Sequence, residues 1–392
     1  MERVLALVNG VVHTGAAVVR DRAVLVRGAR IAGLVAPAAV PDGADVVDLA
    51  GAHLAPGFVD LQVNGGGDRL LADDPTPATV AAIAAAHQRR GTTDLLPTLV
   101  TSPDETRRAA IAAVGACLAD GVPGVLGIHL EGPFLNPARA GVHDPARMRR
   151  MRRDDAAALP AWRGGRVLLT VAPEMADDGA VAAAVRAGAK VSAGHTDADA
   201  ARIAAAVAEG LDGATHLFNA MRGIDRREPG AAGALLADDR VACGLIADGV
   251  HVHPDLLRFA WRVKPAGRAF LVSDAMPPVG GRRRRFAIGG RTAAVADGAC
   301  RTADGTLAGA AIDLATAVRV AVQRAGIPLD AALRMASTAP ARHLGLGDRL
   351  GRIAPGCAAN LVALDDALRV RAVWVAGRPV PGAGAPDDAP AA

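Results

Sequence analysis

Residues 56–68 read PGFVDLQVNGGGD, and this stretch decides the fold. A Pro-Gly pair leads into a short, continuous apolar run, which ends in the polar side chains of Gln62 and Asn64 just before three glycines. Continuous apolar runs of this length are typical of strands buried on both faces of a parallel sheet. The stretch therefore predicts a parallel α/β fold and places two polar groups at the end of its first buried strand.

Seven further apolar runs follow, separated by Ala-rich stretches of helical character with Asp or Thr starts and Gly stops. The eight predicted strands are FVDLQVN, DLLPTLV, VLGIHLEG, RVLLTVAP, KVSAGH, GATHLFN, VACGLIADG and AFLVSDA. Eight strand–helix units within residues 56–345 fit a (β/α)8 TIM-like barrel better than a doubly wound sheet. A doubly wound sheet would also be expected to have a phosphate-binding loop after its first strand, but NGGGD has neither the GxGxxG nor the P-loop spacing.

Both ends of the chain alternate apolar and polar residues, as in RAVLVRGARIAGL near the start and ANLVALDDALRVRAVWVAGRPV near the end. This alternation indicates half-buried strands. Neither end is long enough to bury a stable hydrophobic core alone, so we expect residues 1–55 and 346–382 to form one small β-sandwich domain together. The last residues, 383–392, are rich in Pro, Gly and Ala and are predicted to be a disordered tail.

The composition argues against several classes of partner. The chain has 392 residues, of which 51% are hydrophobic, so it can bury a large core. Its net charge is +4, but only 2% of its residues are aromatic, so we expect no nucleic-acid partner. We also expect no membrane partner, because no apolar run is long enough to span a bilayer and the first residues lack a signal-peptide pattern. Four widely spaced cysteines without a CxxC pair favour reduced thiols and a cytoplasmic location.

Polar side chains stand at the ends of several predicted strands. They are Gln62 and Asn64 on the first strand, Glu131 on the third, His195 on the fifth, His216 on the sixth and Asp274 on the eighth. In a barrel the carboxyl ends of all strands meet at one mouth, which is where active sites lie. Two histidines and a carboxylate match a catalytic zinc site, in which three protein ligands leave a position open for water. Asp274 is then free to take a proton from that water.

Taken singly, each of these residues has a structural interpretation, because a lone His is usually hydrogen-bonded and a Ser-Asp pair is common at a helix start. Taken together, burying these ionisable groups at the ends of apolar strands costs free energy, which favours a functional role for the set. Other polar patterns are interpreted differently. His251 and His253 lie in a loop after the seventh strand, where they are better placed for substrate than for metal. His87 is expected at the surface of a helix remote from the mouth, and the arginine run 282–285 is expected in a solvated loop.

Nine stretches in family order resemble the N-acetylglucosamine-6-phosphate deacetylases of the amidohydrolase superfamily. They are PGFVDLQVNG, HLEGPFL (129–135), SAGHTDA (192–198), THLFNAM (215–221), REPG (227–230), ADGVHVHP (247–254), LVSDAM (271–276), DGTLAGA (304–310) and GRIAPGCAANLVALD (351–365). The resemblance covers nearly the whole chain. It implies a (β/α)8 barrel with a flanking β-sandwich built from both termini, in agreement with the pattern of strands.

The resemblance also implies a metal count. Members with His-x-His on the first strand bind two metals, whereas members with Gln-x-Asn, as here, bind one. The ligands implied for this chain are Glu131, His195 and His216, which would hold one divalent ion, zinc in the first place with iron and cobalt as alternatives. Asp274 is implied to be the general base that activates the water held by the metal and later passes the proton to the leaving amine. The amide oxygen would be polarised by the metal and by His143.

The remaining implied residues concern the substrate. His251 and Arg227 match the phosphate contacts of the family, with Arg227 reaching the site of the partner subunit in a homodimer. Asn219 and Ala220 would line the phosphate or sugar side of the pocket. One departure is Ala310 or Ala311 where the family often has Ser near the acyl pocket.

The function that the resemblance implies is metal-dependent hydrolysis of N-acetylglucosamine 6-phosphate to glucosamine 6-phosphate and acetate. Within enzymes, the alternative is a related amidohydrolase that acts on another N-acyl sugar phosphate, such as N-acetylgalactosamine 6-phosphate, or on a cyclic amide. An alternative from a different class is a non-catalytic barrel that binds a sugar phosphate. The intact set of Glu131, His195, His216 and Asp274 argues against this last hypothesis.

Overall fold

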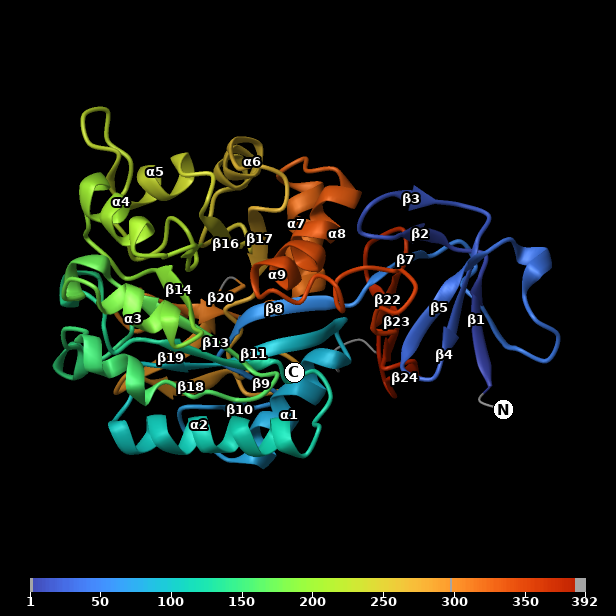
Figure 1. Ribbon diagram of the computed structural model, residues 1–392, viewed down its shortest axis with the longest axis horizontal. Coiled ribbons are helices and arrows are strands. Elements are labelled where there is room, and N and C mark those ends of the chain that lie inside the picture. Colours follow the sequence, from blue (N-terminus) through green and yellow to red (C-terminus); the bar gives the residue numbers. More distant parts are fainter. Residues whose placement is uncertain (1–2, 297, 385–392) are drawn as a thin grey trace.

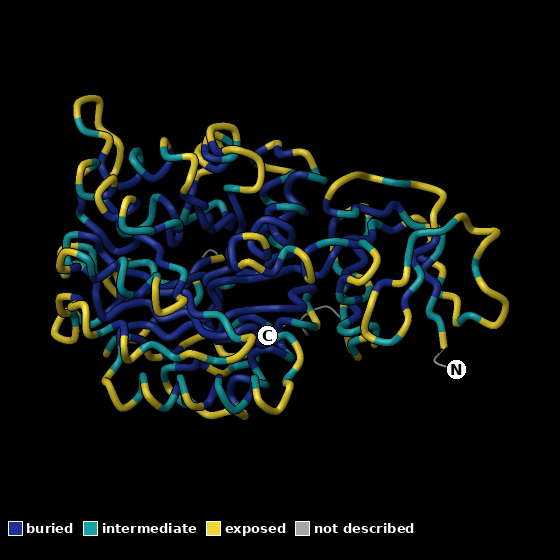
Figure 2. The backbone as a smooth tube through the Cα atoms, in the orientation of Figure 1, coloured by how far each residue is buried: buried dark blue, intermediate teal, exposed yellow. Residues whose placement is uncertain are grey.

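A computed structural model describes residues 3–296 and 298–384. It contains a large barrel and, beside it, a smaller group of β-sheets to which both ends of the chain contribute (Figure 1). Buried backbone runs through the middle of the barrel, and exposed residues lie mostly in its peripheral loops and helices (Figure 2). The predicted fold class, a (β/α)8 barrel with a separate β-rich unit from both termini, is confirmed.

The barrel contains one sheet of eight parallel strands. In chain order these are β8 (Phe58–Val63), β11 (Thr92–Val100), β12 (Gly127–Glu131), β13 (Arg166–Val171), β14 (Lys190–Ala193), β15 (Gly213–Ala214), β16 (Ala242–Ile246) and β17 (Ala269–Val272). Each falls within or overlaps one of the eight predicted apolar runs. The residues of β8 and β11 are all buried, as expected for strands covered on both faces.

The first and last strands of the barrel meet at a seam just beyond their regular hydrogen bonding. Val63 forms a parallel bridge with Ala275, and the backbone N–H of Asn64 donates to the carbonyl oxygen of Ala275 at 2.9 Å. The carboxylate of Asp60 accepts the backbone N–H of Ser273 at 3.2 Å. These bonds bring the ends of β8 and β17 together, and with them the polar residues that follow.

Nine helices accompany the sheet in the described part of the chain. They are α1 (Pro77–Gln88), α2 (Asp104–Ala119), α3 (Ala180–Arg186), α4 (Ala200–Ala208), α5 (Gly230–Ala237), α6 (Pro254–Val263), α7 (Leu314–Gln323), α8 (Leu329–Ala336) and α9 (Thr338–His343). Side-chain caps explain several starts: Thr76 accepts from the N–H of Thr79, and Asp199 accepts from the N–H of Arg202. None of the nine combines the length and apolar character needed to cross a bilayer.

The third strand–helix unit departs from the repeat. No α-helix lies between β12 and β13; the connection contains three 3₁₀ turns, at Pro137–Arg139, Pro145–Arg147 and Arg153–Ala158. Asn136 and Asp144 cap the first two turns through their side chains. This long connection carries His143 toward the barrel mouth.

The β-rich unit has two sheets. The first contains β5 (Arg30–Val35), β4 (Ala23–Arg27), β1 (Val4–Val8) and β6 (Asp45–Asp48). The second contains β24 (Arg378–Pro379), β23 (Val370–Val375), β22 (Leu361–Leu364), β7 (His53–Pro56), β2 (Val11–His13) and β3 (Val18–Val19). Leu7 and Leu54 share one hydrophobic cluster with Leu361 and Trp374, so the two ends of the chain depend on each other for burial.

The domain boundaries, 1–55 with 346–382 and 56–345, stay a prediction. The predicted tail at 383–392 lies outside the described residues from residue 385 onward. Its first two residues are described: Ala383 donates a backbone hydrogen bond to Val380, and Gly384 donates one to Arg89.

A second sheet is inserted in the chain between β17 and α7, and it was not predicted from the sequence. Its antiparallel strands are β18 (Arg285–Ile288), β19 (Arg291–Ala296), β20 (Ala299–Thr302) and β21 (Leu307–Ala310). They follow β17 and precede α7, and we call them the inserted sheet. Their small core contains Val100, Val142 and Met276 from the barrel mouth, together with Phe286 and Ile288 from β18. A short hairpin, β9 (Gly65–Gly66) with β10 (Arg69–Leu70), follows β8 nearby.

Candidate metal centre and catalytic pocket

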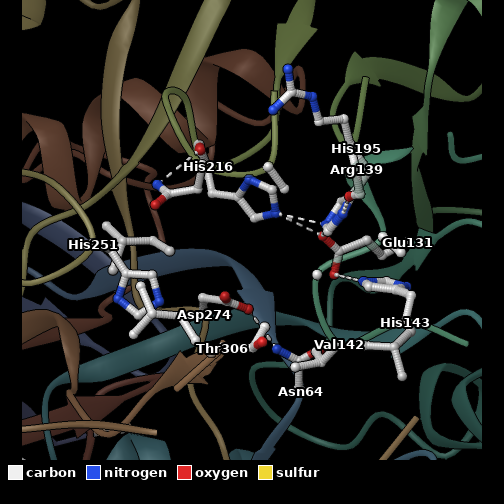
Figure 3. Close-up of a pocket in the computed structure, with 18 of the residues that line it drawn as sticks. Asn64, Glu131, Arg139, Val142, His143, His195, His216, His251, Asp274 and Thr306 are labelled. Atoms are coloured by element: carbon white, nitrogen blue, oxygen red, sulfur yellow. Dashed lines mark hydrogen bonds and ion pairs between the residues drawn. The ribbon is translucent and has the colours of Figure 1, made fainter. Parts of the chain in front are cut away.

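A cavity of about 340 Å³ opens where the barrel strands end. Its lining includes polar residues from β8, β12, β14, β15, β16 and β17 or from the turns just beyond them, and Figure 3 shows how they face one another. These residues are Asn64, Glu131, His195, His216, His251 and Asp274. Groups far apart in the sequence therefore share one pocket, as expected for residues at the carboxyl ends of barrel strands.

Glu131, His195 and His216 form the tightest cluster in the pocket. Oε1 of Glu131 lies 3.2 Å from Nε2 of His195 and 3.0 Å from Nε2 of His216, and the two Nε2 atoms are 3.1 Å apart. All three side chains are buried. In the described part of the chain, no other group of three His, Cys, Asp or Glu side chains has this metal-binding geometry.

Hydrogen bonding shows that the cluster is suited to a cation. Nδ1 of His195 donates to the backbone carbonyl of Arg139 at 2.8 Å, so the neutral ring has a lone pair on Nε2. That lone pair faces a carboxylate oxygen, which can only accept. Burial would raise the pKa of Glu131, but the adjacent imidazole rings of His195 and His216 outweigh it and hold this pKa well below its usual value. Two acceptors 3.2 Å apart need a positive charge between them, which a divalent metal ion supplies.

The turn after His195 is held by a carboxylate from the 3₁₀ turn Pro173–Met175, which follows the neighbouring strand β13. Glu174 accepts from the hydroxyl of Thr196 at 2.5 Å and from the backbone N–H of Asp197 at 2.6 Å. Asp197 in turn accepts from Nη2 of Arg139 at 2.7 Å. Arg139 thus contributes its carbonyl to His195 and its side chain to the following turn, which fixes the orientation of the ligand ring.

Asp274 lies beside the cluster and is buried. Its Oδ1 accepts from Nδ2 of Asn64 at 2.6 Å and from Nε2 of Gln62 at 3.2 Å. Nε2 of Gln62 also lies 3.3 Å from Oε1 of Glu131. Burial, together with the charge of Glu131, raises the pKa of Asp274 to about 7, although the Asn64 hydrogen bond opposes this shift. A carboxylate with a pKa near neutrality is suited to accept and return a proton.

Several residues of the site have a backbone conformation that only glycine adopts easily. The φ angle is +49° at His195, +30° at His216, +49° at Ala220 and +49° at Asp274. Positive φ costs a non-glycine residue about 1–3 kcal/mol, and such residues cluster at functional sites. All four residues line the cavity.

His143 comes from the long connection after β12. Its Nδ1 accepts the backbone N–H of Thr101 at 3.2 Å, and the Thr101 hydroxyl lies 3.0 Å from the same atom. Because a backbone amide can only donate, the proton of the neutral ring is on Nε2, which lies 3.9 Å from Oε2 of Glu131. Burial and the neighbouring His195 lower the pKa of His143 to about 3. His143 is therefore a neutral ring with an N–H donor at the cluster.

His251, Asn219 and Ala220 line the cavity, as predicted. Nδ1 of His251 donates to Oδ2 of Asp248 at 2.6 Å, while Oδ1 of Asp248 accepts the backbone N–H of His251 at 2.8 Å. These bonds fix the ring and leave its Nε2 for a ligand. The Asn219 side chain donates to the carbonyl oxygen of His216 at 3.1 Å.

Arg227 does not line this cavity in a single chain. It is exposed in the loop 222–229, where its backbone N–H binds the side chain of Asp225 at 3.0 Å. The predicted phosphate role of Arg227 stays a prediction.

Sequence reasoning missed part of the cavity wall and misplaced one histidine. Val142, Leu307 and Thr306 line the cavity from two connections that the strand pattern did not place. His87, which was expected at the surface, is fully buried, so that prediction is wrong. Its Nε2 lies 3.0 Å from the carbonyl oxygen of Gly65, so it supports the turn after Asn64. The four arginines at 282–285 are exposed, as expected.

Comparisons with known proteins agree with this geometry. Residues 53–380 match the Amidohydrolase family and residues 4–54 match the NagA composite domain. The N-acetylgalactosamine-6-phosphate deacetylase of Shewanella sp. (strain ANA-3) is 39% identical over 324 residues, covering 83% of this chain and 82% of the relative. The N-acetylglucosamine-6-phosphate deacetylase of Bos taurus is 39% identical over 347 residues, covering 84% of each chain.

The fold is similar to a solved structure over almost its whole length. The crystal structure of N-acetylglucosamine-6-phosphate deacetylase from Pasteurella multocida superposes with a TM-score of 0.91 at 34% identity, covering 96% of this chain and 99% of that one. The resemblance found in the sequence is confirmed, and the chain belongs to the amidohydrolase family.

Proposed function

We propose that this protein is a metal-dependent deacetylase that hydrolyses the acetamide of N-acetylglucosamine 6-phosphate to glucosamine 6-phosphate and acetate. The observation that carries the proposal is the convergence of Asp274 with Glu131, His195 and His216 in one buried pocket. A non-catalytic binding protein would have no need for a strained, buried carboxylate beside three metal ligands. The deacetylase relatives support the same reaction.

Glu131, His195 and His216 would hold one divalent ion, which when bound supplies a Lewis acid that activates water and polarises the amide carbonyl. Zinc fits two imidazoles and one carboxylate best, and iron and cobalt are the alternatives. Gln62 and Asn64 support a single ion, because their amide groups donate to Asp274 and Glu131 and do not complete a second ligand set.

The protein's own groups account for the proton transfers. Asp274 removes a proton from the attacking water as the C–O bond forms, and it then gives that proton to the amide nitrogen as the C–N bond breaks. His143 keeps its proton and donates a hydrogen bond from Nε2–H to the amide oxygen while negative charge develops there. The net change is addition of one water across the C–N bond, which yields acetate and a free amine.

His251 is the phosphate-binding residue best supported within one chain. It lines the cavity, its ring is oriented by Asp248, and Nε2 is left for a ligand. Asn219 and Ala220 lie between this residue and the metal cluster in sequence and line the same cavity, so they suit the sugar or phosphate side.

Arg227 would contribute from a second subunit. It is not among the residues that line the pocket of its own chain, and its exposed position suits a homodimer in which it reaches the pocket of the other subunit. Exposed apolar side chains support an interface nearby: Leu256, Phe259 and Val263 on α6 are 43–46% exposed, and Ile224 in the loop 222–229 is 55% exposed.

A second candidate substrate is N-acetylgalactosamine 6-phosphate, because the Shewanella relative is a deacetylase of that epimer. Ala310 and Ala311 stay candidates for setting the range of acyl groups. A cytoplasmic location is proposed because all four cysteines are free thiols buried in the protein.

Acetate release tests the proposal directly. The purified protein should release acetate from N-acetylglucosamine 6-phosphate, with bound metal quantified on the same sample. Parallel assays with the galactosamine epimer and with unphosphorylated N-acetylglucosamine identify the preferred substrate. The absence of acetate release from both sugar phosphates by fully metal-loaded protein would refute the proposed activity.

A further inference from the structure

The inserted sheet reaches both sides of the catalytic pocket. Leu307 and Gly309 of β21 line the cavity, and the opposite end of the sheet is the turn Gly289–Gly290 between β18 and β19. Asp274 lies just before the sheet in the chain, whereas His143 lies about half the barrel earlier. The sheet therefore contacts two parts of the mouth that are distant in sequence.

At its C-terminal edge the sheet is bonded to the segment that contains Asp274. The backbone N–H of Ala310 donates to the carbonyl oxygen of Asp274 at 2.9 Å, and the N–H of Met276 donates to the carbonyl oxygen of Ala310 at 3.1 Å. A Cβ added to Gly309 would lie 2.8 Å from the Asp274 carbonyl oxygen, so only glycine fits at this approach. The backbone of Asp274 is thus fixed to β21.

At its other end the sheet touches the loop that carries His143. The Val142 side chain lies in the small core of the sheet with Phe286 and Ile288. A Cβ added to Gly289 would overlap the carbonyl oxygen of Val142 and would lie 3.6 Å from the backbone nitrogen of Asp144. Gly289 therefore lies directly against the backbone on both sides of His143.

The His143 loop is also confined from the side of the metal cluster. The rings of His143 and His195 have centroids 4.4 Å apart, and a Cβ added to Gly141 would lie 3.5 Å from Cε1 of His195. Because Val142 precedes His143 in the chain, a side chain at position 289 acts on the His143 loop, whose hydrogen bond with Thr101 is the contact that its displacement would weaken.

We infer that Gly289 is a positioning residue for His143, and that the inserted sheet sets the placement of His143 relative to Asp274. This inference rests on the proposed function, in which these two groups act on the oxygen and the nitrogen of one amide. Because the groups come from separate parts of the chain, an element that is hydrogen-bonded to the Asp274 segment and packed against the His143 loop keeps them in register. Misplacement by about 1 Å commonly costs on the order of 100-fold in rate.

The turn itself supplies a matched pair of variants, Gly289→Ala and Gly290→Ala. Both glycines have positive φ, +55° and +77°, so both substitutions impose similar backbone strain. Apart from its neighbours in the chain, no described residue has an atom within 4 Å of a Cβ built on Gly290, whereas the Cβ on Gly289 meets Val142. Because Asn tolerates positive φ better than Ala, the pair Gly289→Asn and Gly290→Asn repeats the comparison with less backbone strain.

The expected result is a kcat for acetate release that falls on the order of 100-fold in Gly289→Ala and stays within about two-fold of wild type in Gly290→Ala. Metal content should match wild type in both variants. Exchange of the Thr101 amide hydrogen, followed by NMR, should be at least about ten-fold faster in Gly289→Ala only, because its acceptor on His143 moves away.

Equal kcat values for the two variants, or equal Thr101 exchange rates, would overturn the inference. The exchange measurement does not depend on turnover. It therefore tests the contact even if the wild-type protein releases no acetate, an outcome that would count against the proposed function alone.

Discussion

Asn64 and Asp274 are joined by a hydrogen bond of 2.6 Å, from Nδ2 to Oδ1, across the seam where the first and last barrel strands meet. Gln62 adds a second donor to the same oxygen at 3.2 Å. Gln62 and Asn64, the two polar residues at the end of the first barrel strand, are therefore partners of a buried carboxylate. An amide donor favours the charged form of Asp274, which is the form that can accept a proton.

Replacing Asn64 with Ala should move the pH dependence of activity. The pKa of Asp274 is about 7, above its ordinary value of 3.8, and the Asn64 hydrogen bond is one of the influences that lower it. Loss of this donor raises the pKa further, so the base is protonated up to a higher pH. The acid limb of kcat/KM should shift to higher pH by roughly one unit, as measured between pH 5 and 9.

Asn9→Ala is a suitable control for this experiment, because it removes a similar amide-to-carboxylate bond, to Asp48, in the exposed β-rich unit. Its pH profile should match wild type. An unchanged acid limb in Asn64→Ala would mean that Asp274 is not the group whose ionisation limits activity.

His195→Ala and His216→Ala should each lose most of the bound metal together with activity. Each removes one of three protein ligands, and loss of a ligand weakens binding by far more than the 10–100-fold typical of an outer-shell change. Elemental analysis should give close to one ion per chain in wild type and in the exposed control His253→Ala. Two ions per chain would contradict the single-ion site, and metal retention in either ligand variant would contradict the ligand assignment.

Asp274→Asn should separate metal binding from turnover. The side chain is not one of the three ligands, and Asn keeps its size, so metal content should stay near wild type. An amide cannot accept the proton from water, and kcat should fall by about 10²–10⁴-fold. Asp177→Asn, which alters an exposed ion pair with Arg150, is the control. A kcat near wild type would remove Asp274 from its proposed role.

The barrel and most of the polar pocket could be predicted because they depend on local patterns. Apolar runs fix the strands, and the polar residue that ends each run, such as His195 or His216, must then lie at the mouth. His143 gave no such signal, since it lies in a long connection whose path depends on contacts with Thr101 and Gly289. The burial of His87 was not predicted, because the sequence of its helix does not reveal that the ring lies within hydrogen-bonding distance of the Gly65 carbonyl oxygen.

The inserted sheet was missed for a related reason. Its strands are short and its first one begins at the last of four consecutive arginines, so the segment resembles a solvated loop. Their burial comes from residues such as Val142 and Met276, which belong to other parts of the mouth. A pattern confined to the segment itself does not contain that information.

Arg227→Ala should raise KM for the sugar phosphate by about 10-fold or more, since a charge-assisted bond to phosphate contributes about 1.5–3 kcal/mol. Turnover of an unphosphorylated analogue should not change. Arg226→Ala is a matched control, because this neighbour is equally charged and also exposed.

If Arg227 acts on the pocket of the other subunit, then Phe259→Glu on the exposed face of α6 should favour the monomer in sedimentation and raise KM to the same extent. Identical kinetics for the two arginine variants would exclude Arg227 from phosphate recognition, whereas a fully active monomer would show that it acts within its own chain or not at all.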